Sequence, residues 1–367
     1  MRVGWEYKKL GDLCDIYQPK TLATEQLVAD GKYYVYGANG IIGRYNDYNH
    51  EQSEILLTCR GATCGTINIS QPYSWINGNA MVIHRKSEDL SFDFLKYLML
   101  SLDYSLIITG AAQPQITRQK IAPIIVKFPS LSVQQSIVSE LDKISELIRL
   151  KKEQLKDYDN LAQSIFYEMF GDPVVNEKGW GIKKLGNFCE IGTGSTPSRK
   201  NKEYYEGSIS WVKSTEVSNC VIDSTEEHIS EIAIAETNCT IYPKGTILIA
   251  MYGQGKTRGQ IAILNIEATT NQAVAAILPS ELCDKLFLYH CLHLMYENIR
   301  SMARGGNQAN LNLAIVRSIN IILPPLPLQQ AFAQRIELIE QQKAEIQSTI
   351  ADLETLLASR MQYWFDL

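Results

Sequence analysis

The sequence predicts an α+β protein in which two similar mixed α/β domains are separated by two long antiparallel helices. Three features predict this fold class: a repeat of domain size, short apolar segments of strand length inside each copy, and a long apolar seam after each copy. Because both domains and both helices are alike, we expect the helices to pair as a coiled coil about a pseudo-two-fold axis.

The repeat is visible when the chain is compared with itself. Residues 4–16 return as residues 179–191, where eight of thirteen positions are identical at an offset of 175. Average residue frequencies would give about one identity. Residues 128–135 return as 323–330 at an offset of 195, so the second copy carries 20 additional residues between these landmarks. Solenoid repeats are only about 20–50 residues long, so the duplicated unit is a whole domain.

Short apolar segments between Gly- and Asn-bearing loops predict the strands of each domain. In the first copy, the predicted strands are 33–36, 55–58, 66–69, 81–84 and 121–127, with a helix over 92–107. In the second copy, they are 208–212, 246–251, 260–264 and 273–278, with a helix over 282–302. Each copy is therefore expected to be a mixed domain with polar connecting loops.

A seam with 4-3 spacing follows each copy and predicts a long helix. The first seam contains Ile137, Leu141, Ile144, Ile148, Lys151, Leu155, Tyr158, Ala162, Ile165 and Met169. The second contains Phe332, Ile336, Ile339, Lys343, Ile346, Ile350, Leu353, Leu357, Arg360 and Trp364. Each run lacks Gly and Pro and is about 55 Å long as a helix. The seam lysines either fix the register of the pair or extend their ammonium groups to water.

These landmarks divide the chain into a first domain at 1–128, a central helix within 129–172, a second domain at 173–323 and a C-terminal helix within 324–367. The formal net charge of −5 lies in the helices, because 131–172 and 328–367 each carry −3 while both domains are nearly balanced. Balanced domains bind DNA weakly on their own, so a DNA-binding function would need partners that hold phosphates.

The sequence favours a cytoplasmic protein without a membrane partner. It lacks an apolar run of the roughly 18 residues that a membrane span needs, and the apolar stretch of a secretory signal does not follow Met1. The eight cysteines form no C-x-x-C pair, and we expect them to be reduced thiols.

Several segments carry a family resemblance. They are Tyr36-Gly37-Ala38-Asn39-Gly40-Ile41-Ile42-Gly43-Arg44-Tyr45-Asn46, Arg60-Gly61-Ala62-Thr63-Cys64-Gly65, Gly110-Ala111-Ala112-Gln113-Pro114-Gln115-Ile116, Phe166-Tyr167-Glu168-Met169-Phe170-Gly171-Asp172, and Gly194-Ser195-Thr196-Pro197-Ser198-Arg199-Lys200-Asn201-Lys202-Glu203-Tyr204-Tyr205 with Trp211-Val212-Lys213. In this order, and together with the duplication, they resemble the specificity subunits of type I restriction–modification systems, with two target recognition domains.

The resemblance implies a non-catalytic subunit that binds double-stranded DNA. Each recognition domain would read one half of a bipartite, asymmetric site. The helices would dock two adenine-N6 methyltransferase (modification) subunits, and restriction motor–nuclease subunits would attach through these. The alternative is the specificity subunit of another modification system that pairs with a fused methyltransferase–nuclease. A pure scaffold would instead show no sequence preference in the assembled complex.

Polar or aromatic residues on Gly-rich loops are the candidate DNA contacts. They are Asn39, Arg44, Tyr45, Arg60, Arg118 and Lys120 in the first domain, and Arg199, Lys200, Lys213, Lys256, Arg258, Arg304 and Asn307 in the second. The alternative for each is an ordinary solvated surface position. Gln113 and Gln115, like Asn307 and Asn310, either bond adenine edges or fix their own loops.

Three other chemistries are disfavoured. Residues 250–257 fit a relaxed phosphate-binding loop, but such a loop must open a helix, and 258–264 is predicted as a strand. Cys283, His290, Cys291 and His293 do not share one face of a helix, which disfavours zinc. The chain also lacks an N-P-P-[YF] methyltransferase motif. We therefore predict no metal, no cofactor and no catalytic residues.

Overall fold

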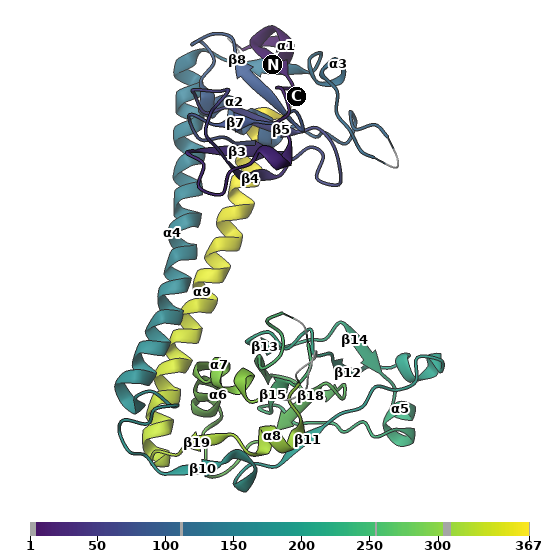
Figure 1. Ribbon diagram of the computed structural model, residues 1–367, viewed down its shortest axis with the longest axis vertical. Helices are drawn as coiled ribbons and strands as arrows, with labels where there is room; N and C mark the ends of the chain where they lie inside the picture. The colour runs from purple at the N-terminus through teal and green to yellow at the C-terminus, as the bar shows by residue number, and fades with distance from the viewer. Residues whose placement is uncertain (1–4, 111–112, 254, 304–309, 367) are drawn as a thin grey trace. The chain divides into compact units, whose positions relative to one another are not determined.

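The computed structural model describes residues 5–110, 113–253, 255–303 and 310–366. The chain forms two compact units, the first made of residues 1–152 and 348–367 and the second of residues 153–347. Two helices of 40 residues, α4 (Leu131–Phe170) and α9 (Leu326–Phe365), contribute one part to each unit (Figure 1). Within the described residues, no helix is both long enough and apolar enough to cross a membrane.

Unit 1 contains three small sheets. The strands β1 (Glu6–Lys9) and β9 (Ile125–Phe128) pair with each other. A four-stranded sheet has the order β2 (Cys14–Tyr17), β8 (Ala80–Arg85), β5 (Ile55–Thr58), β6 (Ile67–Ile69). A three-stranded sheet has the order β4 (Gly40–Tyr45), β3 (Tyr33–Gly37), β7 (Trp75–Ile76). The helices are α1 (Leu10–Leu13), α2 (Phe92–Ser101) and α3 (Arg118–Ile121), with a 3-10 turn, η1, at Thr24–Gln26.

Unit 2 repeats this arrangement. The strands β10 (Ile182–Lys184) and β19 (Asn320–Ile322) pair, and a five-stranded sheet has the order β11 (Ile191–Thr193), β18 (Val274–Ile277), β15 (Ile247–Ala250), β16 (Ile261–Leu264), β13 (Cys220–Ile222). A three-stranded sheet has the order β14 (Glu227–Ile229), β12 (Ile209–Val212), β17 (Thr269–Thr270). The helices are α5 (Glu231–Glu236), α6 (Lys285–Leu294), α7 (Tyr296–Ser301) and α8 (Leu313–Arg317), with 3-10 turns η2 (Leu185–Asn187) and η3 (Lys202–Tyr205).

The strand order β2-β8-β5-β6 matches β11-β18-β15-β16, so the predicted duplication is confirmed at the level of topology. In both three-stranded sheets, the central strand is antiparallel to one neighbour and parallel to the other. The strand β13 and the helix α5 are additions in unit 2.

The apolar identical positions of the repeat, Leu, Cys and Ile, are buried in both units. Leu10 and Leu185 are fully buried, and Cys14, Ile16, Cys189 and Ile191 are buried as well. Trp5 stacks on Trp364 of α9 with ring centroids 6.3 Å apart. In unit 2, the Trp180 indole donates to the Phe170 carbonyl of α4 at 2.8 Å. The repeated tryptophan, Trp5 or Trp180, therefore packs at the end of a long helix in each unit.

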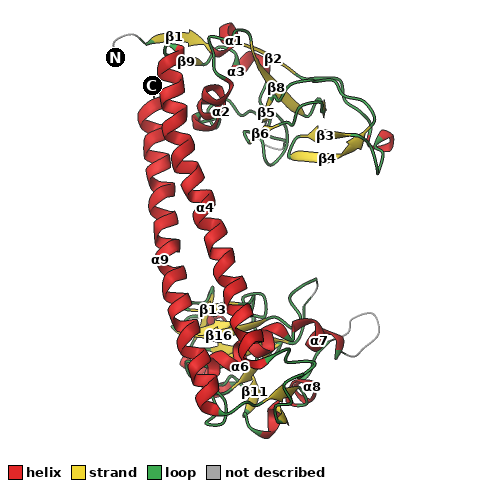
Figure 2. Cartoon of the chain, turned by 90° about the vertical axis from the view of Figure 1, so that its left-hand side faces the viewer, coloured by secondary structure: helices red, strands yellow, loops and turns green. Residues whose placement is uncertain are grey.

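Each unit is layered. The central strands are buried on both faces, with Ile247 and Ile249 facing one apolar cluster while Leu248 and Ala250 face another, as expected for alternating side chains. Figure 2 shows α2 of unit 1 between the long helices and the four-stranded sheet, with the hairpin β3–β4 on the far side of that sheet. The three-stranded sheet is therefore the layer farthest from the helices in its unit.

The long helices are antiparallel where they pack on each other in each unit. In unit 1, Glu140 pairs with Arg360 and Lys152 with Glu354. In unit 2, Asp159 pairs with Lys343 at 2.9 Å. Partner numbers fall along α9 as they rise along α4, and the seam residues predicted from spacing are all at least partly buried. Lys343 thus makes an ion pair across the helices instead of only extending to water.

Some predicted elements have different bounds. The predicted strand 121–127 begins at Ile125, because residues 118–121 form α3 and Pro123 follows. The first predicted helix ends at Ser101. The second is divided into α6 and α7 at Met295, whose φ of −85° and ψ of 6° interrupt the helix. The first long helix ends where predicted, before Gly171, which has a φ of +77°.

The motif repeated at 128–135 and 323–330 contains a buried glutamine. The Gln134 amide accepts from the Ser91 N–H at 2.8 Å and donates to the carbonyls of Asp89 and Pro129 at 2.9 Å each. Gln329 likewise accepts from the Asp284 N–H and donates to Pro324. Both glutamines are fully buried, so each one joins the start of a long helix to the N-terminus of a domain helix.

We expect Gln134→Ala to lower the free energy of unfolding by about 2–4 kcal/mol, because it leaves a buried N–H and two carbonyls without partners. Urea unfolding of the full chain measures this loss. The neighbouring Gln135 is exposed, so Gln135→Ala is the matched control and should change stability by less than about 0.5 kcal/mol. Equal losses for the two variants would contradict a stabilising role of the Gln134 hydrogen bonds.

Candidate nucleic-acid interface

In unit 1, three loops are bonded to one another. The Thr58 and Thr63 hydroxyls donate to the Ala38 carbonyl and to the Asn39 side chain, which lie in the β3–β4 turn. The Gly61 N–H donates to the Pro114 carbonyl at 3.0 Å. The β3–β4 turn, the loop 59–66 and residues 113–116 therefore form one surface.

This surface carries cations and no acidic residue. Arg60 lies in the loop 59–66, and Arg118 and Lys120 lie on α3, directly after residues 113–116. All three side chains are exposed, as is Asn39. The segments 59–66 and 113–121 contain no Asp or Glu. Four of the six candidates in the first domain are thus brought together.

The other two candidates of the first domain lie on the three-stranded sheet. The Arg44 guanidinium lies 4.3 Å from the centre of the Tyr34 ring and donates to the Tyr34 hydroxyl at 2.9 Å. The Tyr45 ring packs edge-on against Trp75 at 5.4 Å. Both residues are partly buried and contribute to the packing of the sheet.

In unit 2, Lys256 and Arg258 lie on the loop 251–260 between β15 and β16. These strands form an antiparallel hairpin, so the predicted strand is confirmed, and the loop does not open a helix. The loop segment 251–258 has no acidic residue. The Lys256 carbonyl accepts from the Tyr296 hydroxyl at 2.6 Å, and the Arg258 carbonyl accepts from Arg300 at 2.9 Å.

The cation-bearing loops of the two units occupy equivalent places. The Ile116 N–H donates to the Cys59 carbonyl at 3.0 Å, and the Leu311 N–H donates to the Met251 carbonyl at 3.0 Å. A short helix follows in each unit, α3 or α8. The same architectural position therefore presents a hairpin loop with arginine or lysine twice.

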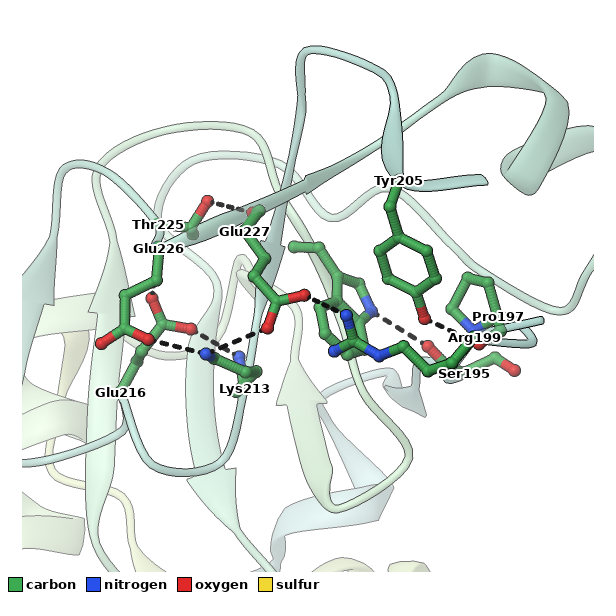
Figure 3. A network of polar contacts seen from close by, with 10 residues as sticks. Ser195, Pro197, Arg199, Tyr205, Lys213, Glu216, Thr225, Glu226 and Glu227 are labelled. Carbon is green, nitrogen blue, oxygen red and sulfur yellow. Dashed lines mark hydrogen bonds and ion pairs between the residues drawn. The ribbon is translucent and has the colours of Figure 1, made fainter. Parts of the chain in front are cut away.

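Arg199 and Lys213 are paired with carboxylates (Figure 3). Arg199 bonds Glu227, while Lys213 lies 2.6 Å from Glu226 and 3.2 Å from Glu227. Hydrogen bonds with Arg199 and Lys213 lower the pKa of Glu227, and those with Glu226 and Glu227 raise the pKa of Lys213. Residues 199–236 contain four basic and eight acidic residues. The positive charge of Arg199 and Lys213 is therefore largely neutralised, unlike that of Lys256.

Three candidates remain, of which the structure describes one. Lys200 is exposed, one residue after Arg199. Arg304 and Asn307 lie outside the described residues. Sequence reasoning did not identify Tyr296, Arg300, Glu226 or Glu227. The first two lay inside a predicted helix, and pairing of the two glutamates with residues 13 to 28 positions away leaves no local pattern.

The residues considered for zinc belong mainly to the core of unit 2. Cys283 and Cys291 are buried, and the His290 ring packs edge-on against Phe332 at 5.4 Å. His290 and His293 line a cavity of about 680 Å³ with Tyr289, Asp159 and Lys343. In the described part of the chain, no group of three His, Cys, Asp or Glu side chains could hold a metal ion.

Unit 2 should lose stability in acid. Burial, with His293 and Lys343 nearby, lowers the pKa of His290 to about 4, whereas the unfolded chain binds this proton near pH 6.5. The unfolded state therefore binds more protons between these values, so lowering the pH from 6.5 to 5 should cost about 2 kcal/mol. Urea unfolding at both pH values should show this loss, reduced in His290→Gln. An identical pH dependence in the variant would contradict the assignment.

Comparison with known proteins gives one consistent result. The sequence pattern of the family described as type I restriction modification DNA specificity domain matches residues 2–157 and 177–354. The chain is 23% identical to the type I restriction enzyme MjaIX specificity subunit of Methanocaldococcus jannaschii, over 77% of this chain and 70% of that protein. It is 26% identical to the type I restriction enzyme EcoR124I/EcoR124II specificity subunit of Escherichia coli, over 65% of this chain and 59% of that protein.

The fold has a matching solved structure. The crystal structure of the type I restriction-modification system S subunit from M. genitalium aligns with a TM-score of 0.60 and 15% identity, covering 100% of this chain and 98% of that one. The similarity therefore extends over both units and both long helices.

Proposed function

Because the chain belongs to the type I restriction modification DNA specificity family, we propose that it gives such a system its DNA sequence specificity, with each unit binding one half of a bipartite, asymmetric site. The observation that carries this proposal is the repeated hairpin loop with exposed cations at the same position of two like folds. Cations hold phosphates and read guanine edges, and two separate readers suit a two-part site.

The partners belong to the same proposal. The long helices dock two adenine-N6 methyltransferase subunits, and restriction motor–nuclease subunits attach through these. The chain itself is non-catalytic and acts in the cytoplasm. The near-neutral charge of both domains supports the need for partners, because a reader with few net charges gains little from counterion release on its own.

The test is to express the chain in a host together with its methyltransferase subunit and to sequence the methylated bases. A single bipartite motif should appear and should vanish without the chain. Methylation without a motif would overturn the proposal. Purification of the complex distinguishes separate methyltransferase and motor subunits from a fused methyltransferase–nuclease.

Lys256 should contribute more to DNA binding than Lys213 in the assembled complex. Lys256 is exposed on a loop without acids, whereas two carboxylates already neutralise Lys213. Removing one phosphate contact should reduce the slope of log affinity against log salt concentration by about 0.9. Binding titrations at several salt concentrations should show this change for Lys256→Ala and not for Lys213→Ala. Equal slopes for the two variants would contradict the assignment.

A further inference from the structure

The described part of the loop 251–260, residues 251–253 and 255–260, is hydrogen-bonded to one helix, α7. The Tyr296 hydroxyl donates to the Lys256 carbonyl at 2.6 Å, and Arg300 donates to the Arg258 carbonyl at 2.9 Å. Arg300 also donates to the Tyr296 oxygen at 3.0 Å. Since that oxygen accepts from Arg300, its own proton is directed to Lys256, and the three bonds form one chain from α7 to the loop.

The loop has little stiffness of its own. Gly253, Gly255 and Gly259 have positive φ values, and glycine has the greatest backbone freedom of any residue. A Cβ at Gly259 would lie 3.0 Å from the Arg300 Cγ, so the arginine stem packs directly on the loop backbone. We call the hydrogen bonds from Tyr296 and Arg300 to the carbonyls of residues 256 and 258 the clamp. The clamp therefore restricts a segment whose sequence favours mobility.

The clamp uses only backbone carbonyls of the loop. The Lys256 side chain stays exposed, and the structure gives its ammonium no ion pair among the described residues. The two oxygens to which Arg300 donates, the Arg258 carbonyl and the Tyr296 hydroxyl, are neutral, so these bonds leave the positive charge of Arg300 beside the loop unneutralised. Tyr296 and Arg300 thus orient a cationic loop without neutralising its positive charge.

We propose that Tyr296 and Arg300 are positioning residues that fix the loop carrying Lys256 and Arg258, and that they thereby determine the base preference of the half-site bound by unit 2. This inference rests on the proposed function. A cation that is held in one place discriminates between base edges by hydrogen-bond geometry. The same cation on an unrestrained loop contacts phosphates of any sequence.

The experiment uses Tyr296→Phe and Arg300→Lys in the complete chain, each assembled with the methyltransferase. Tyr296→Phe removes one hydroxyl and keeps the ring, while Arg300→Lys keeps the charge and removes the planar fork. Methylation is measured on a library of site variants. Discrimination at one or more positions of the second half-site should fall about five- to tenfold, as expected for loss of one net hydrogen bond. The first half-site should be unchanged.

Tyr97→Phe is the control for loss of a tyrosine hydroxyl. Tyr97 lies on α2 of unit 1, and its hydroxyl donates to Asp142 of α4 at 2.7 Å, away from the loops. It should lower the melting temperature without changing base preference at either half-site.

Four outcomes are possible. Loss of discrimination confined to the second half-site supports the clamp. Unchanged discrimination, or a lower melting temperature with unchanged discrimination, overturns it while the proposed function stands. Equal loss at both half-sites overturns it too, because the effect would then not pass through this loop. A wild-type complex without a bipartite motif overturns the proposed function and this inference with it.

Discussion

Replacing residues 173–323 by the second domain of a relative with another specificity is expected to change one half of the methylated motif completely. The reason is that, among the described residues, the apolar clusters around the unit 2 sheets share no residue with the apolar clusters of unit 1. The affinities for specific and non-specific sites typically differ by a factor of roughly 10³–10⁷. The bases recognised in the exchanged half should therefore be replaced completely by those of the relative, and not merely weakened in preference.

The boundaries of this exchange follow the structure. Gly171 and Asp172 follow the end of α4, and Pro324 and Pro325 precede α9, so both junctions fall outside the long helices. The motif is determined by sequencing methylated DNA from cells that carry the chimera and the methyltransferase. The reciprocal exchange of residues 1–128 is the control and should alter only the other half. A change in both halves from either exchange would show that the domains do not read independently.

The sequence predicted the elements whose buried side chains follow a pattern among neighbouring residues of the chain. The strand at 247–250 is a run of four apolar residues that is buried on both faces, and apolar runs of this length between glycines indicate a buried strand. The seams of α4 and α9 were predictable because helical spacing alone brings those side chains onto one face. Other strands were missed. Strands β7 and β17 have two residues each, which is too few for any periodicity. The longer strands β1, β2 and β4 were missed as well; in β4, Gly40 and Gly43 interrupt the apolar pattern.

The candidate site was only partly predictable, because the contacts of its side chains and loops are with residues far away in the sequence. Arg60 and Lys256 stood out as cations beside glycines, and both lie exposed on hairpin loops. By contrast, Arg199 and Glu227 are 28 positions apart. They meet because the Arg199 guanidinium lies over Trp211 of β12, and Trp211 is paired with Glu227 of β14. Tyr296 lies 40 positions from Lys256. A helix pattern indicates which residues share a face and not which loop that face meets.

Phe166→Ala should cause the largest loss of stability of any single change considered. Phe166 of α4 lies 5.6 Å from Phe287 of α6 and 5.5 Å from Phe332 of α9, with Phe170 at 5.0 Å. All four rings are fully buried. Truncating a buried phenylalanine costs about 3–5 kcal/mol, because the lost contacts leave a cavity. For a unit of this size, the melting temperature should fall by roughly 6–20 °C.

Calorimetry of the full chain measures this loss, and the neighbouring residue supplies the control. Tyr167 is 38% exposed on the next position of α4, so Tyr167→Ala should change stability by less than about 1 kcal/mol. Phe166→Leu keeps most of the apolar volume and should cost less than the alanine variant. In the assembled complex at a temperature between the two melting points, Phe166→Ala should lose the second half-site, since unit 2 would then be unfolded. If the alanine variant had the same melting temperature as the wild type, the aromatic cluster would not be what stabilises the packing of the long helices on unit 2.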